Sequence, residues 1–414
     1  MRIAVVDGYS TGATLAQRLH AAGIECIHVQ SRPHTDLAPY LLQSFRPSDY
    51  TRDLGYTPDT GALLAWLRDS RICRVIAGTE SGVTLAEWAS LALGLPTNTP
   101  EQLDARRDKA LMADAVRAAG LATPLATTAR SASEAAAWAD ACGLRDAVVK
   151  PRSSGGSDHV RFCSTPEQVA QAAATILATP NIFNEPNTSV LVQQRLYGTE
   201  YYINSVSSGG VHRVAEIWRY TKRRDPASTP IYDYEEPVPA SSPEAQVLRA
   251  FAFSVLDVLG ITDTPAHTEV MLTTDGPVLI ETGARLGGAT APDIVETYGG
   301  GTSQTSLTTA ALIDPAALLH FDDTSDTWHG RHLRNVEFIN HFHGLPNTSA
   351  LTKIGELPTV VHVASAAAPD TLLEPTRDLL NSPGYAYLAA TDHADIERDY
   401  TTLRAWENEG LHTM

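Results

Sequence analysis

The sequence predicts an α/β fold that begins with a small doubly wound domain and continues into a part with α+β character. Two observations support this prediction. Through the first hundred residues short β-branched runs alternate with helix-like segments, and glycines stand between the first strand and its helix. This order of strand, glycine turn, helix and strand is typical of βαβ units and hence of a parallel sheet. After residue 142 the composition becomes β-like, so further strands are expected there.

The N-terminal elements follow from simple patterns. A strand at 3–6 is followed by Gly8 and Gly12, and an apolar helical pattern then runs to a stop at Gly23. The other elements expected in this part are strands at 26–29 and 74–78 and a helix at 83–93.

The remaining elements are less regular. Residues 101–142 are alanine-rich and expected to be mostly helical. The segment 221–243 is too long and too rich in proline for a tight hairpin, so we expect a loop that forms a lid at the substrate entrance. Strands are expected at 147–150, 189–193, 201–206, 267–273, 277–281 and 360–363, and helices at 244–259 and 394–408.

We therefore expect three domains. They are an N-terminal parallel-sheet domain (1–100), a helical linker with a central subdomain (101–205), and a C-terminal domain (206–414) whose last α+β subdomain begins at about 331.

The charge of the chain excludes some classes of partner. The 414 residues carry a net charge of −17, so neither nucleic acid nor an anionic membrane is expected as a partner, since both bind clustered Lys and Arg. No apolar run is long enough to span a bilayer, and the N-terminus lacks the features of a signal peptide. The four cysteines have no CxxC spacing, so we expect reduced thiols in a cytoplasmic protein.

A lysine before a Gly/Ser-rich turn indicates a phosphate-binding loop. A predicted strand ends at Lys150, and the turn after it contains Ser153, Ser154, Gly155, Gly156 and Ser157. Small residues let backbone amides approach phosphate oxygens, hydroxyls add donors, and the lysine adds a charge. The lysine precedes the glycines, so this is not a Walker A loop. A plain surface turn is the alternative.

A second strand runs into polar residues. Gln193 and Gln194 end it, and Glu200 follows a short turn, so backbone groups are available for a purine and a carboxylate for ribose hydroxyls. The alternative is a strand end with a solvated turn.

Two glutamates are predicted to face each other across a hairpin. Glu269 and Glu281 are twelve residues apart, and the turn residues 273–277 lie between them. Like charges opposite each other destabilise a sheet unless a cation lies between them, and Mg²⁺ accepts one or two carboxylates together with substrate phosphates. The alternative is an exposed edge hairpin. Arg285, four residues after Glu281, offers a planar fork for a carboxylate or a phosphate.

In this order, the features resemble the ATP-grasp superfamily, and within it the ligases that join L-amino acids into dipeptides. Further segments that resemble this subgroup are 6–12, 77–83, 106–109, 217–220 and 382–385. The resemblance implies an ATP-grasp fold and an ATP- and magnesium-dependent ligase, with two Mg²⁺ ions or Mn²⁺ in their place. The substrates are then a small-molecule carboxylate and an amine, joined through an acyl phosphate.

The resemblance also implies roles for single residues. Lys109 and Lys150 contact the ATP phosphates, and the loop 153–157 covers them. Arg285 steadies the acyl phosphate and, with Lys150, counts as catalytic. The implied adenine hinge is Gln193, Gln194 and Leu196, the implied ribose ligand is Glu200, and the implied metal ligands are Glu269 and Glu281.

Besides Arg285, four residues are expected to contact the substrates. Glu80 follows a strand end of the parallel sheet, where ligands gather, although an exposed helix-start glutamate is the alternative. His267 lies two residues before Glu269 and shares its strand face, with a structural histidine as the alternative. Gly287 and Gly288 form the turn after the arginine.

The chain departs from the family pattern at two positions. The family loop often has glycine where this chain has His159, and a metal-binding asparagine is common where this chain has Gly283.

Other functions remain open at this point. They are a ligase that uses a non-amino-acid carboxylate or amine in secondary metabolism, and a non-catalytic nucleotide-binding protein. A nicotinamide-dependent oxidoreductase is disfavoured, because Gly8 and Gly12 lack the GxGxxG spacing. A homodimer is the assembly we expect.

Overall fold

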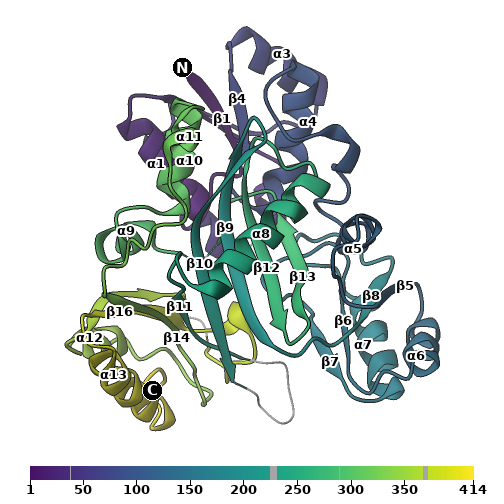
Figure 1. Cartoon of the computed structure of the whole chain (residues 1–414), viewed down its shortest axis with the longest axis vertical. Coiled ribbons are helices and arrows are strands. Elements are labelled where there is room, and N and C mark those ends of the chain that lie inside the picture. Colours follow the sequence, from purple (N-terminus) through teal and green to yellow (C-terminus); the bar gives the residue numbers. More distant parts are fainter. Residues whose placement is uncertain (38, 224–230, 289, 367–371) are drawn as a thin grey trace.

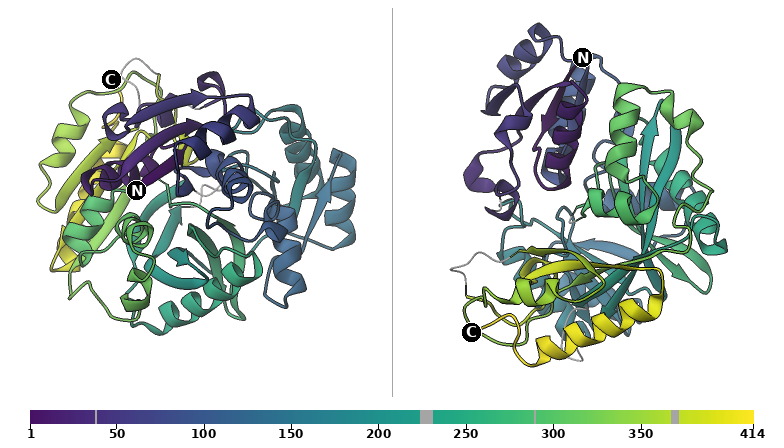
Figure 2. Two further views of the ribbon diagram at one scale, coloured as in Figure 1. Left: turned by 90° about the horizontal axis from the view of Figure 1, so that it is seen from above. Right: turned by 90° about the vertical axis from the view of Figure 1, so that its left-hand side faces the viewer.

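The computed structural model describes residues 1–37, 39–223, 231–288, 290–366 and 372–414. The named strands form three sheets: two of four strands and one of eight. Figures 1 and 2 show the N-terminal sheet at one end of the molecule and the C-terminal helix α13 (His393–Asn408) at the other, with the large sheet between them. This mixed α/β architecture confirms the predicted fold class.

The first sheet is parallel, as predicted. Its order is β3-β2-β1-β4, with β1 at Arg2–Val6, β2 at Glu25–Gln30, β3 at Arg52–Tyr56 and β4 at Arg74–Ala77. The helices of this part are α1 (Thr11–Ala21), α2 (Pro39–Leu42), α3 (Thr60–Asp69) and α4 (Val83–Leu93). Glycine is needed at Gly12, because a Cβ there would lie 2.5 Å from the backbone of Gly78.

The second sheet is antiparallel and packs on alanine-rich helices. Its order is β5-β8-β6-β7, with β5 at Ala126–Ala129, β6 at Ala147–Pro151, β7 at Arg161–Cys163 and β8 at Val190–Gln194. The helices α5 (Lys109–Ala118), α6 (Ala132–Ala141) and α7 (Pro166–Ala178) belong to the same part of the chain. Small side chains such as Ala135 and Ala173 bring α6 and α7 close to Val149 and Val192 of the sheet.

The third sheet has the order β13-β12-β9-β10-β11-β14-β16-β15, and all its neighbouring strands are antiparallel. Its strands are β9 (Thr199–Ser208), β10 (Val211–Arg223), β11 (Ile231–Pro237), β12 (Pro265–Thr273), β13 (Gly276–Gly283), β14 (His332–Glu337), β15 (Val360–Ser365) and β16 (Gly384–Ala390). The helices in this part are α8 (Pro243–Val258), α9 (Pro292–Gly299), α10 (Gln304–Ile313), α11 (Ala317–His320), α12 (Ala350–Gly355) and α13.

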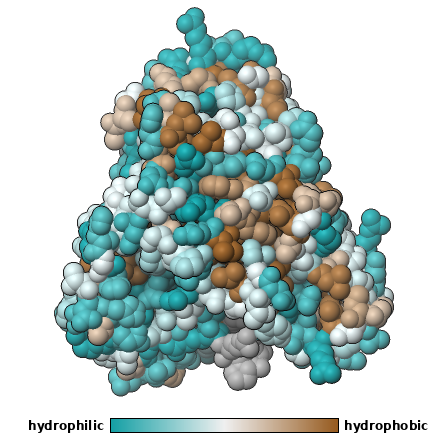
Figure 3. Space-filling model, viewed as in Figure 1, coloured by the Kyte–Doolittle hydropathy of each residue, from teal (hydrophilic) through white to brown (hydrophobic). Residues whose placement is uncertain are grey.

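The helix α8 covers one face of the large sheet and leaves the other face for the site. Leu248, Phe251 and Val255 of α8 belong to one core with Ile203 and Val270 of the sheet. Figure 1 shows α8 lying across the sheet, and Figure 3 shows hydrophobic side chains around it on that side of the molecule. This apolar burial fixes which face of each strand is turned away from α8.

The prediction of a loop over the whole of 221–243 is wrong. Residues up to Arg223 belong to β10, and 231–237 form β11, which pairs antiparallel with it. Alternating aromatic residues favour this strand, and Pro237 stands at its end, where a missing N–H is tolerated. Residues 224–230 lie outside the described part, and with them the predicted lid residue Arg224.

The linker between the first two sheets is fixed by a buried arginine. Arg106, 1% exposed, donates to both carboxylate oxygens of Glu87 on α4 and to the carbonyl oxygens of Leu259 and Thr99. The three-domain division stays a proposal, which the three separate sheets support; β9 crosses the boundary we expected at residue 205. Among the described residues, no helix is long and apolar enough to cross a membrane.

Candidate active site

The site lies on the face of the large sheet opposite α8. The register places His267 opposite Asn204 and Glu269 opposite Tyr202, and Asn204 in turn lies opposite Glu216 on β10. Because side chains on neighbouring strands in register share a face, polar and aromatic groups form a continuous surface across four strands. Sequence reasoning missed this surface, although polar and aromatic residues recur at every second position of β9 and β10.

Glu269 and Glu281 lie directly opposite each other, as predicted. The reason is a β-bulge. The pairs from Thr273 and Gly276 onward would place Glu269 opposite Ile280, but a register shift between Glu269 and Val270 inserts one extra residue. Bulges re-aim side chains in this way. Without it, the two carboxylates would lie on opposite faces of the hairpin.

The two carboxylates are surrounded by cations. Lys109 Nζ lies 3.1 Å from Glu281 Oε2, and it also donates to the carbonyl oxygen of Ser154 at 2.8 Å. Burial alone would raise the pKa of Glu269, but a hydrogen bond from His267 and the charges of Lys222 and Lys150 lower that pKa to about 2. Glu269 is therefore ionised at neutral pH and suited to bind cations.

Lys150 lies on β6 at the centre of these charges and is 4% exposed. Burial lowers the pKa of its ammonium group, while the carboxylates of Glu281, Glu269 and Glu200 oppose this effect. The pKa is lowered overall, so the carboxylates offset only part of the cost of burying this ammonium group, and a phosphate group would offset more of it.

The predicted phosphate loop is anchored at its ends. Ser154 Oγ donates to Asp158 Oδ2 at 2.6 Å, and the same oxygen accepts the N–H of Ile182 at 2.9 Å. The loop includes left-handed residues at Gly156 and Ser157, and His159 has a φ of 52°. That last value explains why glycine suits this position, and His159 adopts it at a cost in strain.

A small cleft lies beside the predicted adenine hinge. It is lined by Lys109, Met112, Ala113, Thr123, Pro124, Ala126, Leu191, Gln193, Leu279 and Ile280. Gln193 is buried, Gln194 is exposed and donates its N–H to Leu125, and Leu196 is half-buried. This small cleft has both polar and apolar lining residues and lies between Lys109 and the predicted adenine hinge.

The predicted ribose ligand Glu200 has an ion-pair partner. Lys222 Nζ lies 2.6 Å from Glu200 Oε1 and over the ring of Tyr232. Two further cations of β10 are also paired: Arg219 binds Glu236 and Arg223 binds Asp233. These two arginines alternate with Lys222 along β10 and so lie on its other face.

Glu80 joins the N-terminal part to the site. Its Oε2 accepts a 2.8 Å hydrogen bond from Arg285 Nε, and its Oε1 accepts one from Arg107. Burial would raise the pKa of Glu80, but the charges of Arg107, Arg285 and Lys109 lower it to about 2. The exposed-glutamate alternative for Glu80 is wrong for this structure, because its side chain is 18% exposed and paired with two arginines.

Gly283 leaves the space that Glu80 uses. A Cβ at Gly283 would lie 2.7 Å from Glu80 Oε2. A side chain at position 283 would therefore displace the Glu80 carboxylate that pairs with Arg285.

Replacing Gly283 with Asn is expected to displace Glu80 from Arg285. Because small displacements of positioning groups cost up to about 100-fold in rate, we expect kcat/KM to fall by roughly 10- to 100-fold. Steady-state ADP formation measures this. Gly355→Asn, at an exposed position with open space around its Cβ, is the control. An unchanged kcat/KM in Gly283→Asn would show that Glu80 does not need this space.

The other predicted substrate residues also gather here. His267 Nδ1 lies 2.8 Å from Asn204 Oδ1, and Asn204 Nδ2 donates to Glu216 at 3.0 Å, so the ring orientation of His267 is fixed. A Cβ on Gly287 would lie 2.9 Å from Asn204, whereas one on Gly288 would meet nothing within 4 Å. The turn after Arg285 therefore has one crowded and one open glycine.

Two buried carboxyl groups lie further along the same face. Burial raises the pKa of Glu235 to about 7. Burial and the neighbouring charge of Glu235 together raise the pKa of Glu337 to about 8. A carboxyl group whose pKa is higher in the folded state than in the unfolded state stabilises the fold. This stabilisation is complete at a pH below the unfolded-state pKa and is lost as the pH rises towards the folded-state pKa.

We expect the free energy of unfolding to fall as pH rises from about 5 to about 8, by on the order of 1 kcal/mol per pH unit for each group. Glu337→Gln, which is neutral at every pH, is expected to reduce that slope. Urea unfolding across this pH range measures it. Equal slopes in the variant and the wild type would contradict the assignment, and Glu356→Gln on the surface serves as control.

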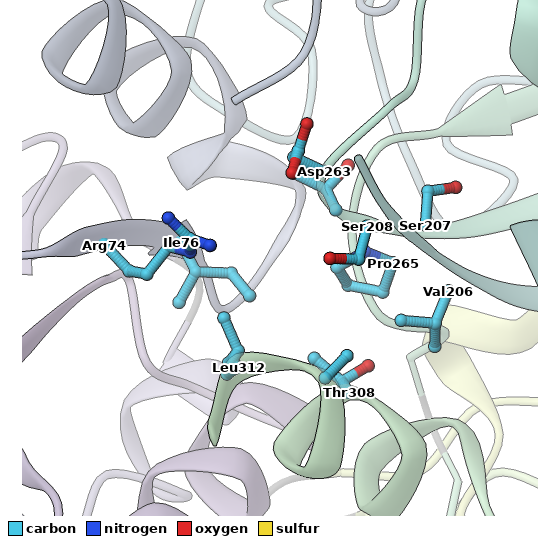
Figure 4. A pocket seen from close by; sticks show the side chains of 11 residues that line it. Arg74, Ile76, Val206, Ser207, Ser208, Asp263, Pro265, Thr308 and Leu312 are labelled. Carbon is cyan, nitrogen blue, oxygen red and sulfur yellow. The ribbon is translucent and has the colours of Figure 1, made fainter. Parts of the chain in front are cut away.

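A second cleft lies away from these residues. Figure 4 shows it between Arg74 and Ile76 of the parallel sheet and Asp263, Thr308 and Leu312 of the C-terminal part. None of the predicted site residues lines it. Within the described ranges, no group of three or more His, Cys, Asp or Glu side chains forms a ready metal site. Two carboxylates alone suit a Mg²⁺ ion whose other ligands are phosphate oxygens and water.

The chain is similar to known proteins in sequence and in fold. A model of the ATP-grasp domain matches residues 145–293. The dapdiamide A synthase of Enterobacter agglomerans is 31% identical over 414 residues, which cover 99% of this chain and 96% of the synthase. The crystal structure of L-amino acid ligase from Bacillus licheniformis has a TM-score of 0.74 at 17% identity, covering 98% of this chain and 97% of that one. N5-carboxyaminoimidazole synthetase from Staphylococcus aureus, crystallised with ADP, has a TM-score of 0.67 at 11% identity, covering 98% of each chain.

Proposed function

The chain belongs to the ATP-grasp family of carboxylate–amine ligases, and on this premise we propose that it activates the carboxylate of an L-amino acid as an acyl phosphate and couples it to an amine. The products are an amide or dipeptide, ADP and phosphate. A carboxylate is a poor acyl donor because its leaving group would be oxide, and transfer of the γ-phosphoryl group of ATP supplies a better one.

One observation carries the proposal. Glu269 and Glu281 face each other on adjacent strands, with Lys150 and Lys109 beside them. Two carboxylates and two lysines on one surface form a site for a metal-bound polyphosphate, because the lysines neutralise phosphate oxygens and the carboxylates hold the metal.

The residues that would bind the nucleotide follow from this geometry. Lys109 and Lys150 would contact the phosphates, with the loop 153–157 above them, and adenine would bind at the cleft beside Gln193 once that cleft widens. Glu200 would bind ribose hydroxyls, in exchange for part of its contact with Lys222. The ADP complex of a fold neighbour supports ATP as the nucleotide.

The metal fits the donors that are present. Glu269 and Glu281 would hold Mg²⁺, as one ion or two, or Mn²⁺ in its place, and the ion would neutralise charge on the β- and γ-phosphates. With Gly283 in place of asparagine, the chain offers one side-chain ligand fewer than the family pattern.

The acid and the amine would lie between Arg285 and the polar surface of the sheet. Arg285 would stabilise the acyl phosphate and the tetrahedral intermediate, with a planar guanidinium suited to oxyanions. Glu80 and His267 would face the amine, and the open space at Gly288 leaves room for a side chain of the substrate.

A ligase that acts on a non-amino-acid carboxylate or amine in secondary metabolism is the second candidate. The name of the relative from Enterobacter agglomerans, a dapdiamide synthase, favours it. A non-catalytic nucleotide-binding protein is a remote third, and the retained set of lysines, glutamates and Arg285 argues against it. We also propose a cytoplasmic location and a homodimer.

A screen separates these candidates. Wild-type protein with ATP and Mg²⁺ is given every pair of the common L-amino acids, and phosphate release and product mass are both recorded. Phosphate release with a product of dipeptide mass supports the amino-acid assignment. No phosphate release with any pair contradicts it, and nucleotide binding without ADP formation would favour the non-catalytic alternative.

A further inference from the structure

Three parts of the chain meet at one arginine. Arg107 donates through Nη1 to Glu80 of the N-terminal part and through Nη2 to Ser153 Oγ of the phosphate loop, at 3.3 Å. Its guanidinium carbon also lies 5.1 Å from the centroid of the Phe183 ring. The side chain is 14% exposed, so these contacts are shielded from water. A guanidinium group can make all three contacts at once because it is planar and has several donors.

The Phe183 ring is held by a second arginine. Arg32, from the N-terminal part, lies 5.3 Å from the same ring centroid and donates to the carbonyl oxygen of Phe183 at 2.7 Å. Next to Phe183, Asn181 Nδ2 donates to the carbonyl oxygen of Ser153 at 2.7 Å. The segment 181–185 is therefore fastened to the N-terminal part on one side and to the phosphate loop on the other.

The loop itself is packed against the same residues. A Cβ on Gly155 would lie 3.9 Å from both the Glu80 side chain and the Phe183 ring. Glu80 also binds Arg285, the residue we assign to the acyl phosphate. The Glu80 carboxylate thus connects Arg285, at the proposed reacting group, with Arg107, at the phosphate loop.

We propose that Arg107 is a positioning residue that holds the loop 153–157 closed over the acyl phosphate, by joining Glu80 to Ser153 while it lies on Phe183. This inference rests on the proposed function for its chemical purpose. An acyl phosphate reacts with water unless the site is closed, so an open loop wastes ATP through hydrolysis of the intermediate. The residue does not need to touch the substrate in order to act.

Amide hydrogen exchange, which needs no substrate, tests whether Arg107 holds the loop 153–157 in place. In Arg107→Met the guanidinium contacts are lost, while Glu80 keeps its partner Arg285, so no carboxylate is left unpaired. We expect amide exchange in 153–158 to become roughly tenfold faster or more, with the rest of the protein unchanged. Arg117→Met, at an exposed arginine in the last turn of α5, is the control. Unchanged exchange in the loop, or faster exchange everywhere, would overturn the proposal.

The ratio of ADP to amide formed tests whether this contact protects the acyl phosphate from water. In the wild type with a productive substrate pair, ADP and amide form in equal amounts; in Arg107→Met we expect several ADP per amide. Phe183→Leu removes the ring but keeps both hydrogen bonds of Arg107, and we expect a smaller excess of ADP. A variant that is slower but still makes one amide per ADP overturns the role of Arg107 in closure. If the wild type makes no ADP with any pair, the proposed function fails instead, and the exchange result still decides the loop contact.

Discussion

Glu281→Gln is expected to abolish both ADP formation and amide formation. The substitution keeps the size of the side chain and removes one of the two charges that face each other across the hairpin. Loss of a residue that only supports a metal ligand already costs about 10- to 100-fold in affinity or activity, so loss of a ligand itself is expected to cost about 1,000-fold or more.

The fold is expected to survive this change. Lys109 loses its ion pair with Glu281 but keeps its 2.8 Å hydrogen bond to Ser154, so its ammonium group is not left without a partner. Phosphate release and product mass measure activity, and thermal unfolding checks the fold. Glu356→Gln is the matched control on the surface. A Glu281→Gln protein that keeps more than about a tenth of wild-type turnover would refute the metal assignment.

Lys150→Met is expected to have the second-largest effect. Lys150 is buried, and burial lowers the pKa of its ammonium group while the carboxylates of Glu281, Glu269 and Glu200 raise it. Removing a fixed charge from a water-poor site that stabilises developing phosphate charge costs about 100- to 1,000-fold in kcat. We therefore expect a fall of that order, together with weaker ATP binding.

Calorimetric titration with ATP and single-turnover ADP formation separate the two effects. Lys353→Met, on the surface of α12, is the control for loss of one lysine. ATP affinity and turnover close to wild type in Lys150→Met would mean that the lysine is a structural counter-ion for Glu281 and has no role in phosphate chemistry.

Local patterns were enough to predict several parts of this fold. The strand and glycine pattern at 3–23 predicts the first βαβ unit. The structure explains the glycine at position 12, because Gly78 approaches it too closely for a side chain. The strand β3 was not predicted, since Arg52–Tyr56 is mostly exposed and contains Gly55 in a left-handed conformation. The strand β11 was mistaken for a loop because its flanking prolines obscured the aromatic alternation.

The candidate site was predictable only where its residues are close in sequence. The spacing of Glu269 and Glu281 indicates a hairpin, yet the bulge that places them on one face has no clear sequence signal. The pair of Glu80 and Arg285 spans 205 residues, so no spacing could reveal it. The sequence likewise does not show that a side chain at position 283 would collide with Glu80, because the two residues are far apart in the chain.

The most direct measurement of the central claim follows one oxygen atom. The amino acid that acts as acid is labelled with ¹⁸O in its carboxylate, and the reaction is run with ATP, Mg²⁺ and the amine found in the screen. If the γ-phosphoryl group is transferred to the carboxylate, one ¹⁸O atom must appear in the released phosphate when the amine displaces it. Unlabelled phosphate, or label in AMP, would contradict the acyl phosphate mechanism.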